Sequence, residues 1–187
     1  LTGLHPVTTL TLSVPKPAAG RPALLSVDET ITLFHEFGHV LHGLFADSVH
    51  PSHAGTSVPR DYVEFPSQQF EMWALHPQVV PGYARHWETD EALDPEVIET
   101  LRDAQGFGQG FETLEYLAAA MLDLGWHALE DGEEIEDVLL FESEVLSAAG
   151  FDPVVPPRYR STYFAHTFTG GYASGYYSYL WSEQYAA

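Results

Sequence analysis

Residues 32–45, TLFHEFGHVLHGLF, place three histidines and one glutamate in a strongly apolar segment. Burying imidazoles and a carboxylate among Leu, Phe and Val is unfavourable unless another group pairs with them. A metal ion is the obvious partner, because residues 35–39 match H-E-x-x-H, although so short a match also arises by chance. On a helix, His35 and His39 share one face and reach one ion, with Glu36 beside a metal-bound water.

A third ligand is needed, because a catalytic zinc takes three protein ligands and keeps a fourth position for water. His42 continues the same face, but on a straight helix it lies about 10 Å along the axis from His35. We therefore expect His42 to contact a ligand or the substrate, with a packed histidine as a nearly equal alternative. Glu64, set among aromatic and aliphatic neighbours, is the better candidate. Glu71, on the same face as Glu64, either orients an imidazole or is a solvated helix residue.

Two helices must hold these residues. Ser26 and Glu29 form a capping box ahead of the apolar run, which predicts a helix from about Ser26 to Phe45. A second helix is expected over residues 61–75, with Asp61 as its N-cap.

The rest of the chain predicts a mainly α fold with a small β element. The β element is residues 7–14, VTTLTLSV, which are β-branched and Thr-rich. The other expected elements are a helix starting at Asp94-Pro95, a long buried helix in 111–131, an amphipathic helix in 133–150 closed by Gly150, an extended connection over 151–160, and a segment, 170–185, that begins flexible and ends helical. We expect one domain, 1–187, made of metal-binding helices (26–75), a helical section (94–150) and a Tyr/Gly-rich substrate loop and helix (158–187).

Composition excludes several classes of function. The 27 acidic and 7 basic side chains give a net charge of −20, which disfavours nucleic-acid binding. No apolar run is long enough for a membrane span. The absence of cysteine excludes disulfide frameworks and thiolate metal sites and fits a reducing compartment. We expect a cytoplasmic protein, with the periplasm left open because a chain beginning at Leu1 is expected to be an internal piece.

Four segments in the same order resemble the thimet oligopeptidase family of zinc metallopeptidases, and within it the bacterial peptidyl-dipeptidases. They are KPAAGRPALLSVDETITLFHEFGHVLHGLF, GTSVPRDYVEFPSQ, PPRYRSTYFAHTF and GGYASGYYSYLWSE. The resemblance implies a zincin-type catalytic region, incomplete at both ends, in which His35, His39 and Glu64 hold one zinc per chain and Glu36 is the general base. It also implies a deep channel between two mainly helical halves, which admits short unstructured peptides. This chain is far shorter than family members, so it would normally pack against the missing parts of its parent chain.

The resemblance further implies functional roles for His166, Tyr172 and Tyr179. Tyr172 and Tyr179 are seven residues apart, so they can share one helix face, and their phenols can donate hydrogen bonds to an oxyanion. His166 can donate to the same oxyanion or to a substrate carbonyl. Without the resemblance, core packing is the favoured interpretation of such a tyrosine stripe. Glycines beside these residues favour a loop that closes over substrate, and Tyr176 stays ambiguous.

Release of C-terminal dipeptides requires a group that binds the terminal carboxylate. Arg158 or Arg160, or a nearby tyrosine, is our candidate, with an internal salt bridge as an equally good alternative. The sequence thus predicts zinc-dependent release of C-terminal dipeptides from short peptides. The alternatives are an endo-acting oligopeptidase of the same family, a truncated zinc-binding module without activity, and a piece that does not fold alone.

Overall fold

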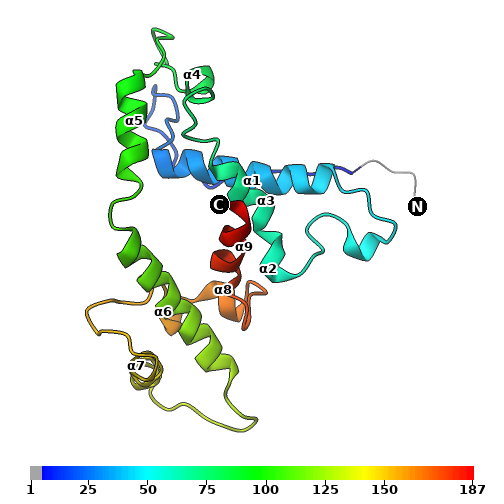
Figure 1. Cartoon of the computed structure of the whole chain (residues 1–187), viewed down its shortest axis with the longest axis vertical. Helices are drawn as coiled ribbons and strands as arrows, with labels where there is room; N and C mark the ends of the chain where they lie inside the picture. The colour runs from blue at the N-terminus through cyan, green and yellow to red at the C-terminus, as the bar shows by residue number, and fades with distance from the viewer. Residues whose placement is uncertain (1–5) are drawn as a thin grey trace. The chain divides into compact units, whose positions relative to one another are not determined.

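The computed structural model describes residues 6–187, and its regular structure is helical (Figure 1). The chain divides into two compact units, Leu1–Gly106 with Trp181–Ala187, and Phe107–Leu180, which are taken in turn. Among residues 6–187, no helix combines the length and the apolar character that a membrane span requires.

The first unit contains the H-E-x-x-H segment. Its elements are α1 (Val27–Leu44), η1 (Pro51–His53), α2 (Arg60–Val63), α3 (Phe65–Glu71), α4 (Val80–Tyr83) and α5 (Pro95–Ala104). The capping box at the start of α1 is confirmed, because the Ser26 side chain accepts from Glu29 N and the Glu29 side chain accepts from Ser26 N. The predicted start of α5 is confirmed too, with Asp94 accepting from Glu96 N at 2.9 Å.

Helices α1 and α3 pack against each other at Gly38 (Figure 1). A Cβ atom on Gly38 would lie 2.5 Å from Ser67 Cα and 2.7 Å from the carbonyl oxygen of Pro66. No real Cβ approaches backbone so closely, so only glycine permits this crossing. The crossing sets the distance between the histidines of α1 and the two acidic residues at the ends of α3, Glu64 and Glu71.

The strand predicted over residues 7–14 is wrong. These residues adopt neither helix nor strand, and the isolated β-bridge found among the described residues joins Arg85 to Ala92. Most of the segment is exposed. β-branched residues favour a strand only where a neighbouring strand accepts the ladder hydrogen bonds, and no described segment does so here.

The single helix predicted over residues 61–75 is also wrong, because the chain forms α2 and α3 with a break at Glu64. Pro66 lies in the first turn of α3, where it lacks the N–H that a continuous helix would need, and it disfavours helical geometry at the residue before it. Asp61 is not an N-cap but lies inside α2, whose N-cap is Pro59.

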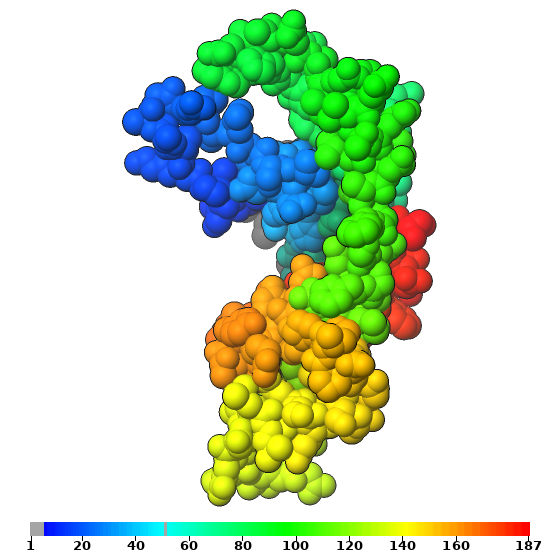
Figure 2. Space-filling model, turned by 90° about the vertical axis from the view of Figure 1, so that its left-hand side faces the viewer, coloured from blue at the N-terminus to red at the C-terminus, as the bar shows by residue number. Residues whose placement is uncertain are grey.

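The second unit is built around one long helix. Its elements are α6 (Gln109–His127), α7 (Val138–Ala148), η2 (Ser161–Tyr163) and α8 (Ala165–Phe168), while α9 (Ser178–Ala186) begins in it and ends in the first unit. The predicted long helix is present as α6, but it is not largely buried, because large apolar side chains on it, Phe111, Leu114, Met121 and Leu124, are exposed. Helix α7 starts later than expected, at the N-cap Asp137. Yellow α7 packs against the orange segment that carries η2 (Figure 2). The core of this unit consists of Tyr116, Ala119, Ala120, Phe164 and Tyr176.

We expect Gly38→Ala to destabilise the chain by about 1–3 kcal/mol, the usual cost of overpacking. Helix propensity alone would favour alanine by about 1 kcal/mol, so the sign of the change reports the clash with Ser67 and Pro66. Denaturant unfolding measures it. Gly82→Ala is the matched control, because a Cβ there meets nothing within 4 Å, and its stability should stay within about 0.5 kcal/mol of the wild type. Equal stability of both variants would contradict the close crossing.

Candidate metal centre

Three side chains from two elements converge in the first unit. His35 and His39 project from α1, and Glu64 lies at the junction of α2 and α3. Glu64 Oε2 lies 3.2 Å from His35 Nε2 and 3.1 Å from His39 Nε2. One possible ligand atom from each residue fits within 4.8 Å of the other two, the only such group of His, Cys, Asp or Glu found among the described residues.

The carboxylate of Glu64 is almost fully buried, with 4% of its side chain exposed. The break between α2 and α3 places it there, because Glu64 ends one helix and precedes the other. Ser67, one turn further on and fully buried, donates its hydroxyl to the Glu64 carbonyl oxygen at 2.7 Å and lies 3.2 Å from Glu64 Oε2. Sequence reasoning missed Ser67, although a serine three residues after a candidate ligand was the available signal.

His35 lies between two carboxylates. Its Nδ1–H donates to Glu71 Oε1 at 2.6 Å, while its Nε2 faces Glu64. Burial alone would lower the pKa of His35, but the hydrogen bonds and negative charges of Glu64 and Glu71 outweigh it and raise this pKa to about 9. Of the two roles considered for Glu71, contact with an imidazole is the one observed.

The donor set fits a zinc ion. Atoms about 2.0–2.1 Å from a tetrahedral zinc are about 3.3 Å apart, close to the two observed N···O separations. A carboxylate on Nδ1 of His35 fixes the tautomer that leaves Nε2 for the metal. His39 Nδ1 is buried and has no hydrogen-bond partner among the described residues, whereas its Nε2 lies 3.1 Å from Glu64 Oε2.

Glu36 and His42 flank this group on α1. Glu36 is half-buried and follows His35 directly, so it stays our candidate general base. His42 does not belong to the converging group. Burial, and then the neighbouring His39, lower the pKa of His42, which favours a neutral ring.

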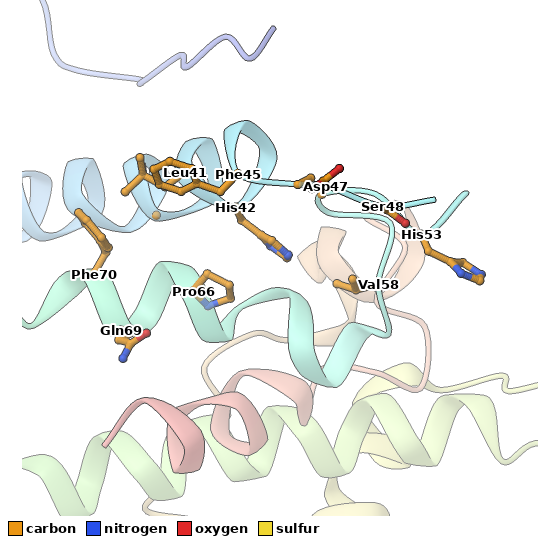
Figure 3. Close-up of a pocket in the computed structure, with 13 residues that line it drawn as sticks. Leu41, His42, Phe45, Asp47, Ser48, His53, Val58, Pro66, Gln69 and Phe70 are labelled. Carbon is orange, nitrogen blue, oxygen red and sulfur yellow. The ribbon is translucent and has the colours of Figure 1, made fainter. Parts of the chain in front are cut away.

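His42 borders a pocket of about 520 Å³ at the end of α1. Figure 3 shows its imidazole between α1 and the α2–α3 segment, with Phe70 and Pro66 on the α3 side. None of the three converging residues lines this pocket, so it is separate from the metal position.

The C-terminal candidates gather in the second unit. The ring of His166 lies 6.1 Å from that of Tyr172, 5.6 Å from Tyr176 and 6.3 Å from Tyr179, measured between centroids. The rings of Tyr172 and Tyr179 stack at 5.2 Å. Tyr176 is buried in the core, which favours packing as its role.

The two candidate arginines differ in their partners. Arg160 Nε donates to buried Glu142 at 2.6 Å, the internal salt bridge considered as an alternative. Arg158 is exposed. Burial, and then Tyr159, raise the pKa of Tyr176, and the positive charge of Arg158 opposes this rise.

The fold and the site define a mainly helical protein of the H-E-x-x-H class. The chain belongs to Peptidase family M3, whose sequence profile matches residues 2–187. This confirms the family expected from the four sequence segments.

Curated relatives agree. Dipeptidyl carboxypeptidase of Escherichia coli (strain K12) is 54% identical over 183 residues, which are 97% of this chain and 27% of that protein. Dipeptidyl carboxypeptidase of Salmonella typhimurium is 52% identical over 172 residues, with 91% and 25% covered. Oligopeptidase A of Salmonella typhimurium is 38% identical over 188 residues, with 97% and 27% covered. The chain therefore spans about a quarter of the length of these relatives.

We expect graded losses of zinc affinity when the two glutamates are changed. Glu71→Gln should weaken binding by about 10–100-fold, because it removes only the partner of a ligand. Glu64→Gln should weaken it further, because it removes the anionic ligand itself. Competition against a chromogenic chelator measures both affinities. Glu99→Gln is the control: it removes the same charge at an exposed position on α5, and this variant should bind zinc as tightly as the wild type. Unchanged affinity in Glu64→Gln would contradict the site.

Proposed function

We propose that this chain carries the catalytic centre of a zinc peptidase that removes C-terminal dipeptides from short unstructured peptides. The convergence of His35, His39 and Glu64, with Glu36 next to the first ligand, carries the proposal. The names of the relatives with 54% and 52% identity support dipeptide release in particular.

His35, His39 and Glu64 would hold the ion, with Glu71 and Ser67 orienting two of them. A bound zinc supplies a Lewis acid that polarises a carbonyl and makes a coordinated water acidic. Two neutral imidazoles and one carboxylate leave a net positive centre, which suits that chemistry.

Glu36 has the role of proton carrier. As general base it takes the proton of the attacking water, and it then gives this proton to the amine that leaves. Its half-buried position on the same helix as two of the proposed ligands supports this role.

His166, Tyr172 and Tyr179 would act on the substrate. A neutral phenol donates a hydrogen bond without adding charge, so either tyrosine can stabilise the oxyanion that forms at the scissile carbonyl. His166 would donate to that oxyanion or to a neighbouring carbonyl. Their grouping in one cluster lets them act together.

Arg158 is our candidate for recognition of the terminal carboxylate. Arg160 is less suited, because its guanidinium is already held by Glu142. A planar guanidinium binds a carboxylate through two parallel hydrogen bonds, which selects the end of a peptide over its interior.

Replacing the general base should abolish cleavage and preserve the metal site. Glu36→Gln should lower kcat by about 10²–10⁴-fold while the chain binds one zinc, because the glutamine cannot accept the proton. Zinc content and peptide cleavage are measured on the same sample, with Glu99→Gln as the control. Zinc bound by wild type and variant with no cleavage by either would contradict an active chain and support a binding module. No zinc in either would contradict both.

Specificity can be tested with a decapeptide carrying either a free or an amidated C-terminus. From the peptide with a free C-terminus we expect successive loss of C-terminal dipeptides, seen by mass spectrometry. The peptide with an amidated C-terminus should be cleaved about 10–100-fold more slowly, since a hydrogen bond to a charged group contributes about 1.5–3 kcal/mol. Arg158→Gln should slow cleavage of the free peptide only, and Arg102→Gln should change neither. Internal cuts at equal rates in both peptides would instead favour an oligopeptidase.

A further inference from the structure

A buried carboxylate lies in the middle of α6, outside the metal centre. Asp123 has no exposed surface, although the helix around it is largely apolar. An isolated ionised carboxylate at such a position is strongly unfavourable, so its partners indicate what it is for.

Four polar groups surround the Asp123 carboxylate. Oδ1 accepts from the Thr167 hydroxyl at 3.0 Å and from the Ser174 backbone N–H at 2.9 Å, and Oδ2 accepts from the Tyr176 backbone N–H at 2.8 Å. His127, one turn further along α6, places Nδ1 3.0 Å from Oδ1. Asp123 therefore joins α6, α8 and the loop between α8 and α9.

Two of these bonds hold the loop in a conformation that the backbone does not favour. Ser174 has a φ of 54°, in the left-handed region that residues other than glycine rarely adopt. Its N–H is one of those that Asp123 accepts. A second anchor lies on the same face of α6, where the Tyr116 hydroxyl donates to the Tyr176 carbonyl oxygen and accepts from Leu180 N at 3.3 Å.

The anchored residues alternate with the proposed substrate-binding residues. Thr167 follows His166 directly, and Ser174 lies two residues after Tyr172. Tyr179 follows the loop at the start of α9. Fixing Thr167 and Ser174 thus fixes the backbone close to each member of the His166–Tyr172 pair, whose rings are 6.1 Å apart.

We propose that Asp123 is the positioning residue of this cluster, holding His166 and Tyr172 in the arrangement that acts on substrate. The inference rests on the proposed function, because it takes these residues to contact the peptide. Asp123 itself touches no substrate and acts through the loop. The glycine-rich loop was expected to be flexible, but the Asp123 carboxylate binds two of its backbone N–H groups.

The test compares Asp123→Asn with the wild type by kinetics and by NMR. The asparagine keeps the volume but can no longer accept at both oxygens. We expect kcat to fall by about 10²-fold, the cost of a misplacement near 1 Å, with KM changed less than about twofold and zinc content unchanged. The NMR signals of the His166 ring C–H protons are assigned as those missing from the spectrum of His166→Gln. In Asp123→Asn these signals should lose the ring-current shift that the neighbouring tyrosines cause.

Glu142→Gln is the matched control, because it removes another buried carboxylate of the same unit, which binds Arg160 and Ser161 N instead of the loop. It should lose stability and leave the His166 signal and kcat unchanged. Thr167→Val removes a single bond to Asp123 and should move both readouts in the same direction by less, so it carries the test if Asp123→Asn does not fold.

Two failures are distinguishable. A His166 signal that is the same in folded Asp123→Asn and wild type, or that moves equally in Glu142→Gln, would overturn the positioning role. A wild-type chain that binds zinc and cleaves no peptide would overturn the proposed function, and a changed His166 signal in Asp123→Asn would still support the anchoring.

Discussion

The metal centre depends on how closely α1 approaches α3. Because Gly38 has no side chain, the backbone of Ser67 lies closer to α1 than a Cβ atom at position 38 would allow. That approach brings Glu64 under both histidines, and Ser67 holds the carboxylate there. Because the ligands come from two packed elements, their spacing is set by backbone contact and not by flexible side chains. The centre is therefore organised before an ion arrives, which reduces the ordering that binding requires.

The same proximity creates an electrostatic problem that the site solves locally. Two glutamates and two histidines share a small, partly buried volume, and a buried carboxylate is unfavourable without a cation. A proton on His35 supplies that cation, as its pKa of about 9 indicates, and the ring is then bonded to both carboxylates. An ion that takes the position must displace this proton, so binding is coupled to proton release. Glu71 is bonded to Nδ1, the ring nitrogen that does not face Glu64.

The sequence predicted what depends on local patterns. The capping box, the placement of His35 and His39 on one helix and the long helix α6 are each readable within a few turns of helix, and each is found in the structure. The failures share a cause. Whether residues 7–14 form a strand depends on a partner strand, and whether Glu64 lies within one helix or between two depends on Pro66 and on what α3 packs against. Asp123 was missed because its partners, not its neighbours in sequence, give it a role. Ser67 was missed although its partner Glu64 lies only three residues before it.

Asp123 and Glu64 illustrate which exceptions to a pattern carry information. A chain with a net charge of −20 has many carboxylates, and most of them are exposed to solvent. Both are buried, although their neighbours in sequence are mostly apolar. Asp123 accepts hydrogen bonds from α8 and from the loop that follows it, and Glu64 Oε2 lies within 3.2 Å of the Nε2 atoms of two histidines on α1. An acidic residue among apolar ones on a helix, such as Asp123 in LAAAMLDLGW, is therefore a signal that can be used when a sequence is interpreted. It identifies the position where the helix must hold something polar, even when the sequence cannot say what.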